Sequence, residues 1–398
     1  MQSVCLNFHV HLPRVLRHYS FFDIDHDHVY EDGERNQQIL DKMCGECYLP
    51  ANNIMLDLIG RHKGDFRLSF SITGILLDLF EQYSHDVLKS FQRLADTGCV
   101  EFISETYYHS LAFLFFPREF KEQVTIQRKK IKTFFGKTPT VFRPTALIYT
   151  NALAQIIEKM GYGVILIEEG EGGFGHRSPN HVYQPAGCRK LKALVRNQRL
   201  SDDIAVRFAD PQWSEYPLSA AQYAHWIHSM NDSEDSINIF MDYEIFGKHR
   251  GEETGIMTFM EHFPGEILKN PNFCFRTPSE TARDCNSGGE LDAPDIISPA
   301  DDGTDLMKAW FGNALQKDAV TTLYGMEAKV RRRKDEVCLH VWRMLQALDH
   351  FTNMRTEGLD HEDGQQHPNP YGSPYDAYIN YMNIIDDFSR RISNIKRS

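Results

Sequence analysis

The segment N-I-F-M-D-Y-E-I-F-G-K-H, residues Asn238–His249, decides the fold because it joins a buried strand to two acids. Its apolar start, Ile239 to Met241, is typical of a strand in a parallel sheet that is buried on both faces. Asp242 and Glu244 follow, and acids at the end of a buried strand are costly to desolvate unless they bind or react with something. In barrel enzymes the carboxyl ends of the strands carry the chemistry. The segment therefore predicts a site at these two acids, with a simple cap on the next turn as the structural alternative.

The composition is that of a globular protein and limits its partners. With 398 residues the chain is long enough for one large α/β domain and an accessory one. Its 43 basic and 55 acidic residues give a net charge of −12, which excludes a nucleic-acid partner because phosphates require a basic surface. The N-terminal residues turn polar too soon for a signal peptide, and no run of about 18 apolar residues predicts a membrane span. We therefore expect no membrane partner and a cytoplasmic location.

Neither the cysteines nor the glycines indicate a metal or a cofactor. The eight cysteines are scattered, which is typical of reduced thiols in a cytoplasmic protein. Cys44 and Cys47 form a lone C-x-x-C pair, whereas a structural zinc site needs four ligands. The glycine-rich run Glu168–Gly173 lacks the G-x-G-x-x-G spacing of a dinucleotide site. The sequence therefore predicts no resident metal and no cofactor.

Two further groups of polar residues are candidates for ligand contacts. His9 and His11 alternate along a predicted strand, so both side chains point to one face. They suit a metal pair, hydrogen bonds to a polyhydroxylated ligand, or a structural role. Four acids have the spacing of an EF-hand loop, but His28 stands where that loop needs glycine, so we expect a loop at the rim of a cleft and leave cation binding open. These acids are Asp23, Asp25, Asp27 and Glu34.

Strands and helices alternate over about the first 260 residues, which predicts an α/β fold with a parallel sheet and favours a barrel. We predict a barrel at 1–270, a linker rich in Asn, Ser, Gly, Pro and Asp at 271–304, and a helical domain at 305–398. The predicted strands are Ser3–Val10, Phe66–Ile72, Cys99–Ser104, Thr140–Tyr149, Val164–Ile167 and Ile237–Met241. The predicted helices are Asn36–Arg61 with a break at Leu49-Pro50, Leu76–Thr97, Phe120–Phe135, Leu153–Met160, Ser219–Met230, Leu306–Gln316, Ala319–Arg333, Glu336–Asn353 and Tyr375–Ile395.

Five segments of the chain match the motifs of one known family. They are Phe8–Pro13, Gly98–Phe102 with Glu105–Leu111, Val141–Tyr149, Phe240–Gly247 and Ala309–Gln316. Together with the similar tail Ser373–Met382 they run nearly from end to end of the chain, and the combination is highly specific. On these residues the chain resembles the α-amylase-like branch of glycoside hydrolase family 57.

The resemblance implies an incomplete (β/α)7 TIM-like barrel followed by a C-terminal α-helical region, with α-glucans such as starch, glycogen or maltodextrins as ligands. Members are retaining enzymes with two carboxylates, and the general acid of the family falls on Asp242. The nucleophile, a glutamate in the family, falls on Ala146, and Leu12 and Ile245 also depart from the family pattern. The residues that the resemblance leaves for substrate binding are His9, His11, Glu101, Glu105, His109, Arg143, Glu244 and Trp310.

The replacement at Ala146 leaves two functional hypotheses. In the first, the protein binds α-1,4-glucans without normal retaining hydrolysis, because a methyl group cannot attack an anomeric carbon and losing one member of a catalytic unit costs about 10⁴–10⁶ in rate. Thr145 does not take over, since in an extended strand it points to the opposite face. In the second, the enzyme inverts, with Asp242 as acid and a base placed about 6.5–9.5 Å away. The candidate bases are Glu101, Glu105 and Glu168.

Overall fold

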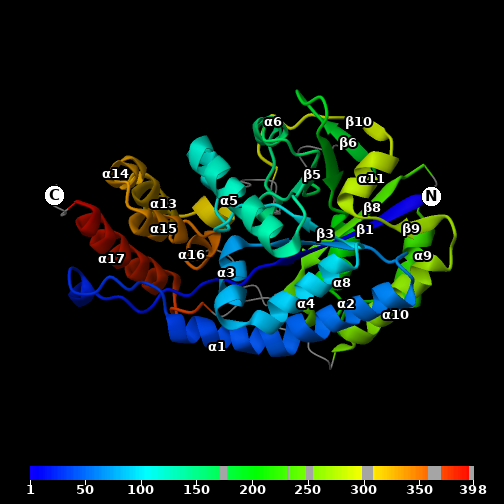
Figure 1. Ribbon diagram of the computed structural model, residues 1–398, viewed down its shortest axis with the longest axis horizontal. Helices are drawn as coiled ribbons and strands as arrows, with labels where there is room; N and C mark the ends of the chain where they lie inside the picture. Colours follow the sequence, from blue (N-terminus) through cyan, green and yellow to red (C-terminus); the bar gives the residue numbers. More distant parts are fainter. Residues whose placement is uncertain (171–176, 231–232, 248–253, 298–307, 357–368, 394–398) are drawn as a thin grey trace. The chain divides into compact units, whose positions relative to one another are not determined.

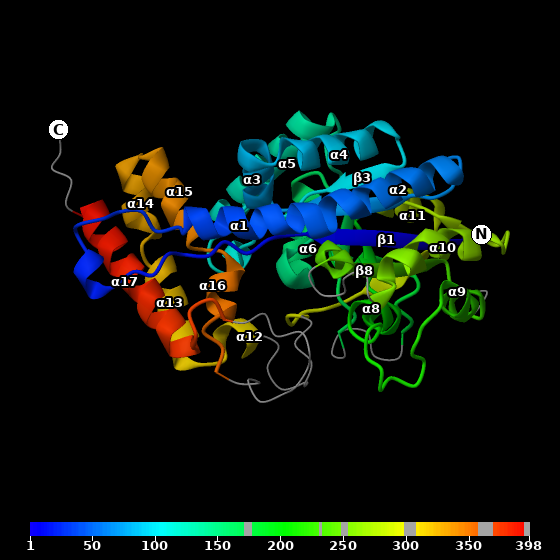
Figure 2. The same cartoon turned by 90° about the horizontal axis from the view of Figure 1, so that it is seen from below.

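The computed structural model describes residues 1–170, 177–230, 233–247, 254–297, 308–356 and 369–393 (Figure 1, Figure 2). The chain forms two compact units whose segments alternate along the sequence. The predicted domain boundaries at residues 270 and 304 stay a prediction. The first unit holds Met1–His11, Leu40–Tyr107 and Lys121–Pro299, and the second holds Leu12–Ile39, Tyr108–Phe120 and Ala300–Ser398. Parts of the sequence predictions lie outside the described residues, namely the glycine-rich run after residue 170, the linker after 297, and residues 306–307 and 394–395 of two helices.

The strand β1, Gln2–Val10, is the centre of the first unit, and all nine of its residues are buried. One edge of β1 pairs in parallel with β8, Ser236–Asp242. The other edge pairs with β9, Phe273–Phe275, at its start and with β2, Leu68–Ile72, at its end. The strand β2 in turn pairs in parallel with β3, Val100–Ile103. Complete burial of β1 is typical of a parallel sheet whose faces are both covered.

A second sheet continues this series of parallel strands. It contains β4, Val141–Phe142, β5, Val164–Ile167, and β7, Lys192–Val195, which pair in parallel in that order. A parallel bridge between Ser104 and Phe142 connects the end of β3 to β4. Beyond β7, the strand β6, Val182–Pro185, runs antiparallel to it, and β10, Ser287–Leu291, pairs with β6.

Among the described residues, eight strands, β1 to β5 with β7, β8 and β9, are thus parallel, and the predicted α/β class with a parallel sheet is confirmed. Between β7 and β8 the described residues form no ladder, although the Asn197 amide beyond β7 donates to the Asn238 carbonyl of β8. Within the described part of the chain the barrel is therefore not closed. Since the strands are parallel, their carboxyl ends lie at the same end of the unit.

The helices of the first unit cover these strands (Figure 1). The predicted helix at residues 36–61 consists of α1, Gly33–Met43, a π-helical turn η2, Cys44–Tyr48, and α2, Leu49–Arg61. The predicted break at Leu49-Pro50 is wrong, because the backbone stays helical there and the irregularity is the π-turn before it. The predicted helix at residues 76–97 divides into α3, Gly74–Tyr83, and α4, His85–Asp96. The remaining helices with residues in this unit are α5, Pro117–Phe135; α6, Asn151–Lys159; α8, Gln198–Ala205; α9, Ala220–His228; α10, Ile256–Leu268; and α11, Pro278–Asp284.

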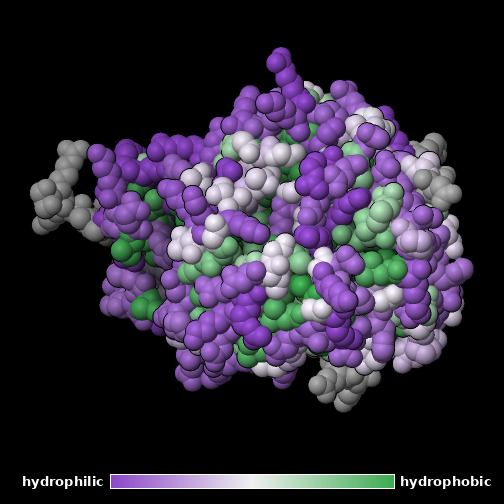
Figure 3. Space-filling view, turned by 45° about the vertical axis from the view of Figure 1, so that its right-hand side comes forward, coloured by the Kyte–Doolittle hydropathy of each residue, from purple (hydrophilic) through white to green (hydrophobic). Residues whose placement is uncertain are grey.

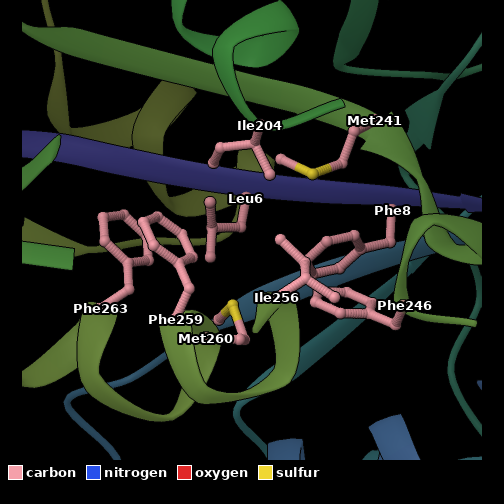
Figure 4. A pocket seen from close by; sticks show the side chains of 9 residues that line it. All are labelled: Leu6, Phe8, Ile204, Met241, Phe246, Ile256, Phe259, Met260 and Phe263. Atoms are coloured by element: carbon pink, nitrogen blue, oxygen red, sulfur yellow. The ribbon is translucent and has the colours of Figure 1, made fainter. Parts of the chain in front are cut away.

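A small pocket in the core lies between β1, β8, α8 and α10 (Figure 4). Every side chain that lines it is apolar, so it offers no polar group to orient a substrate, and we interpret it as part of the core packing. The lining residues are Leu6, Phe8, Ile204, Met241, Phe246, Ile256, Phe259, Met260 and Phe263.

The second unit is mainly helical and is organised in part around a buried acid. Asp387 is fully buried and accepts hydrogen bonds from the Tyr30 hydroxyl at 2.6 Å, from His28 Nδ1 at 2.8 Å and from the Asp25 amide at 2.7 Å. This one carboxylate therefore holds the N-terminal acidic loop on α17. The described helices of this unit are α12, Lys308–Phe311; α13, Ala314–Tyr324; α14, Glu327–Arg333; α15, Glu336–Met344; α16, Leu348–Thr352; and α17, Pro374–Ser393.

The acids with EF-hand spacing in this loop are engaged by protein groups. Asp27 lies 2.9 Å from the guanidinium of Arg17, and Asp25 lies 3.1 Å from that of Arg390. Asp23 accepts hydrogen bonds from the amide and the hydroxyl of Ser20, in a capping box. These contacts engage Asp23, Asp25 and Asp27 within the loop, whereas Glu34 lies in the first turn of α1.

The face shown in Figure 3 is mostly hydrophilic, with small scattered apolar areas. Among the described residues, no helix combines the length and the apolar character that crossing a membrane requires. All eight cysteines are free thiols, as predicted.

Candidate active site

Polar side chains gather where the parallel strands of the first unit end. His9 lies near the end of β1, Glu105 follows β3, Arg143 follows β4 and Glu168 follows β5, and all four are buried. Asp242 is the last residue of β8 and is exposed. Because the carboxyl ends of parallel strands meet, five strands that are distant in sequence deliver these groups to one region. The sequence prediction of a site at this end of β8 therefore agrees with the arrangement of the strands.

The imidazole of His9 stands between two carboxylates. Its Nδ1 lies 3.2 Å from Asp242 Oδ1, and its Nε2 lies 3.4 Å from Glu105 Oε2. Burial and the charge of Arg143 lower the pKa of His9, but the two carboxylates outweigh them and raise it to about 9. At neutral pH, His9 is therefore an imidazolium that donates a hydrogen bond to Asp242 and forms an ion pair with Glu105.

Asp242 is the acid that remains open to a ligand, since its side chain is 64% exposed. Desolvation opposes its ionisation, yet the hydrogen bond from His9 and the positive charges of His9 and Arg143 hold the pKa of Asp242 well below its usual range. The high exposure of the side chain weakens the opposing desolvation, so the stabilisation of the carboxylate by His9 and Arg143 prevails. In the unliganded protein, Asp242 is thus a carboxylate held in place by an imidazolium.

Arg143 supplies a buried positive charge to the same region. Burial lowers its pKa, while the carboxylates of Glu105, Asp242 and Glu168 raise it and partly compensate. Glu168 forms an ion pair with Arg196, which follows β7, at 3.2 Å. Burial nevertheless raises the pKa of Glu168, and Arg196 reduces that rise. Two arginines, Arg143 and Arg196, and two acids, Glu105 and Glu168, therefore form one network of charges behind the open carboxylate of Asp242.

Glu244, two residues beyond Asp242, is buried in the short helix η5, Tyr243–Phe246. Its Oε1 accepts a hydrogen bond from the Tyr48 hydroxyl at 2.7 Å and one from the His11 amide at 3.2 Å. Burial and the charge of Asp242 raise the pKa of Glu244 to about 7. Neighbouring acids whose pKa values are pushed apart are typical of sites that bind or react.

The histidine pair of the first strand is divided between these two acids. The rings of His9 and His11 stack at 5.7 Å, as expected for side chains on one face. His9 contacts Asp242, whereas His11 binds Glu244 through its amide and shares a hydrogen bond of 3.1 Å with the Thr73 hydroxyl through Nδ1. Both histidines thus lie at the predicted site and align its acids.

Ala146 lies in a tight turn that follows β4. The predicted strand at residues 140–149 is wrong, because β4 ends at Phe142 and Thr145–Leu147 form a 3-10 turn. Ala146 and Leu147 have φ values of 52° and 54°, a left-handed conformation that costs roughly 1–2 kcal/mol per L-residue. Thr145 is buried and its hydroxyl shares a hydrogen bond of 2.8 Å with that of Thr106, so it is engaged in the interior. Such strain is concentrated at functional sites in proteins.

One predicted site residue, Glu101, is engaged away from these strand ends, and two others belong to the second unit. The carboxylate of Glu101 binds the amide and hydroxyl of Ser279 at the start of α11, so the structure does not support it as a substrate contact or base. His109 and Trp310 belong to the second unit. There the His109 Nδ1 lies 3.4 Å from Asp349 Oδ2, and Trp310 is buried in α12.

Sequence analysis missed three residues that support the site, namely Tyr48, Thr73 and Arg196. Arg196 and Thr73 each follow a short strand directly, and that position was the available signal. Tyr48 follows Cys47 inside a helical pattern, and no feature of the sequence there indicates a contact with Glu244.

The buried imidazolium of His9 predicts a pH-dependent stability. Because folding raises its pKa from 6.5 to about 9, its stabilisation is complete below pH 6.5 and is lost as the pH rises through 9. We expect the free energy of unfolding of wild type, relative to His9→Gln, to fall by on the order of 1–3 kcal/mol across that window. Urea denaturation of both proteins at a series of pH values measures this difference, and a constant difference would contradict the pairing.

Comparison with known proteins reveals relatives over nearly the whole chain. Residues 5–296 match the family model for glycosyl hydrolase family 57. A protein of Methanocaldococcus jannaschii described as a putative alpha-amylase is 35% identical over 410 aligned residues, which cover 98% of this chain and 85% of that protein.

Solved structures share the fold at low sequence identity. A 4-alpha-glucanotransferase from Thermococcus litoralis has a TM-score of 0.74 at 13% identity; the match covers 100% of this chain, which spans only 60% of that protein. A GH57-type branching enzyme from Pyrococcus horikoshii has a TM-score of 0.68 at 13% identity, covering 97% of this chain and 88% of that protein. The family model, which matches well over half of the chain, and the 35% identical relative agree with this fold. The chain belongs to glycosyl hydrolase family 57.

Proposed function

We propose that this protein binds α-1,4-glucans, such as starch, glycogen or maltodextrins, and lacks normal retaining hydrolysis because Ala146 occupies the place of the nucleophile. A retaining glycosidase needs a second carboxylate about 5–5.5 Å from its acid. The observation that carries the proposal is the turn after β4. There Ala146, whose side chain is only a methyl group, has a strained left-handed backbone, and the turn follows one of the parallel strands whose ends carry the site. The acid is present and the side chain that would attack the sugar is absent.

The polar groups that remain support ligand binding. Asp242 is exposed, ionised and oriented by His9, so it can accept hydrogen bonds from sugar hydroxyls. Behind it, Glu105 and Arg143 fix the charge of the region, which reduces the reorganisation needed when a ligand arrives. The descriptions of the relatives, a putative alpha-amylase and a 4-alpha-glucanotransferase, support an α-glucan as that ligand.

The alternative function is inverting hydrolysis with Glu168 as base and Asp242 as acid. Burial raises the pKa of Glu168, which makes its carboxylate a stronger base, and Arg143 interacts with both carboxylates. Glu105 is a poorer base for a water opposite Asp242, because the His9 ring occupies the space between the two acids. Inverting hydrolysis at this site would therefore use Glu168, and not Glu105, as its base.

Binding and hydrolysis of maltoheptaose and glycogen, measured on the same wild-type sample, test the proposal. We expect calorimetry to detect binding and chromatography to find no shortened glucan. Cleavage that releases the inverted anomer and disappears in Glu168→Gln would support the alternative instead. Absence of binding to either glucan would contradict both functions.

A further inference from the structure

The π-helical turn η2 packs closely against the helix η5 that carries Glu244. A Cβ atom at Gly247, the residue after η5, would lie 2.6 Å from the Cβ of Cys47 and 2.9 Å from the Glu46 carbonyl, so only glycine permits this approach. The Cys47 thiol donates to the Tyr243 carbonyl at 3.3 Å. Single π-turns inside helices are frequent at functional sites, and this one lies against the acidic segment of the site.

Two buried tyrosines connect η2 to η5 but serve different partners. The rings of Tyr48 and Tyr243 are stacked, with centroids 6.4 Å apart and planes 8° from parallel, and neither side chain is exposed. The Tyr48 hydroxyl donates to Glu244 at 2.7 Å, whereas the Tyr243 hydroxyl donates to Asn52 at 2.8 Å. The two hydroxyls therefore have equal burial and similar bond lengths, but only one of them reaches the site.

The opposite side of η5 rests on the apolar core. Phe246 lies beside Phe8 and Ile256 in the apolar pocket of Figure 4, and its ring centroid is 5.6 Å from that of Phe8. The backbone of η5 is thus fixed from both sides. What remains adjustable is the carboxylate of Glu244, and its hydrogen bonds decide its orientation and charge.

We propose that Tyr48 is a positioning residue, which holds the carboxylate of Glu244 in the orientation that accepts a sugar hydroxyl beside Asp242. The proposal rests on the proposed function as a glucan-binding protein. A hydroxyl donor bound to a buried carboxylate favours the ionised form and restricts its rotation. When the Tyr48 hydroxyl is removed, the hydrogen bond that Glu244 still accepts from another element is the one from the His11 amide.

The charged and titratable groups around Glu244 define how its ionisation depends on pH. Burial and the charge of Asp242 raise its pKa, whereas the hydrogen bond from Tyr48 and the charge of His9 lower it, with the balance at about 7. The thiol of Cys47 also faces Glu244, and its own pKa is raised by burial and by that acid. Binding that needs ionised Glu244 is therefore complete above pH 7 and weakens as the pH falls through this value.

Two matched variants test the proposal. In Tyr48→Phe we expect the pKa of Glu244 to rise by about one, because a hydrogen bond to the charged form is lost. Carbon-13 NMR of protein labelled at the glutamate carboxyls, assigned with Glu244→Gln, measures this pKa without a ligand. The pH midpoint of maltoheptaose affinity should rise equally, with about a fivefold to tenfold loss of affinity at pH 7. Tyr243→Phe removes an equally buried hydroxyl and should leave both midpoints unchanged.

The outcomes separate the two proposals. Equal shifts in Tyr48→Phe and Tyr243→Phe, or no shift in either, would overturn the positioning role. If wild type binds no glucan while Tyr48→Phe alone moves the pKa of Glu244, the proposed function fails and the positioning of Glu244 stands. Should Tyr48→Phe fold poorly, Tyr48→Leu removes the hydroxyl donor without adding volume to this buried place, and the same NMR titration decides.

Discussion

In the Ala146→Glu variant we expect hydrolysis of maltoheptaose to become measurable, at a rate about 10⁴-fold or more above wild type. Loss of one member of a catalytic pair typically costs about 10⁴–10⁶ in rate, so its return should recover a large part of that factor. Asp242 is present and exposed, and His9 holds it in place. Because nearby positive charges keep its pKa low in the free protein, Asp242 must take up a proton in the sugar complex before it acts as the acid. A carboxylate on the turn after β4 is the component that the retaining mechanism lacks here.

The backbone at position 146 can accept this change. Ala146 already carries a Cβ at a φ of 52°, so glutamate adds little backbone strain beyond what wild type holds. The residue is only half-buried, which leaves room for a longer side chain. Arg143, three residues earlier, can balance a new negative charge in this region.

Reducing-end release and the anomeric configuration of the product measure the gain. The control Ala146→Gln has the same shape without a nucleophile and should stay at the wild-type level. Adding Asp242→Asn to Ala146→Glu should remove most of the gained rate. Retained binding without any gain of hydrolysis in Ala146→Glu would show that the missing nucleophile is not what limits the reaction.

The part of the site on the long buried strands could be predicted from the sequence. In β1 and β8, apolar residues run directly into His9, His11 and Asp242, so the change from apolar to polar marks the strand end. Parallel pairing of the two strands then brings these groups together, with His9 in register with Asp242. Here the local pattern and the tertiary structure agree, because burial imposes both.

Other parts depend on tertiary contacts that no local pattern contains. Glu101 and Glu105 share the period of a strand, but four residues of extended chain separate them by about 13 Å, and only Glu105 reaches the carboxyl end. The strands β6 and β7, of four residues each, are too short for a periodic signal, so Arg196 was missed. The turn at Ala146 could not be predicted from the sequence, because the residues with a left-handed backbone, Ala146 and Leu147, are not glycines and so give no turn signal.

In the second unit, the Glu119→Ala variant should lose about 3–5 kcal/mol of unfolding free energy. Glu119 has no exposed surface, and its Oε1 accepts a hydrogen bond from Arg343 Nε at 2.7 Å. Its Oε2 accepts from Arg331 at 2.6 Å and again from Arg343 at 3.1 Å. Removing the acid takes this counter-charge from the buried guanidinium of Arg343 and from that of Arg331, while Arg331 keeps its ion pair with Glu327. Breaking a buried ion pair from one side typically costs this much.

The control for this loss is an ion pair at the surface of the same unit. Asp386 and Arg390 lie 2.9 Å apart on α17, and both side chains are nearly half exposed. Asp386→Ala should therefore cost less than about 1 kcal/mol. Hydrogen exchange read by mass spectrometry should show faster exchange in α14 and α15 for Glu119→Ala than for Asp386→Ala. If both variants lose the same small amount, the buried triad is solvated in solution and does not stabilise the unit.

A triple replacement separates the cost of breaking the triad from the net contribution of the intact triad. Replacing Glu119, Arg331 and Arg343 together by apolar residues of similar volume removes the charges and their desolvation penalty at the same time. Such exchanges are often neutral or stabilising by about 1–4 kcal/mol, so the triple variant should unfold at a higher urea concentration than Glu119→Ala. A triple variant as unstable as Glu119→Ala would mean that the triad contributes net stability through its hydrogen bonds. The expected order follows from electrostatics, since an unpaired buried charge costs more than the pair gains.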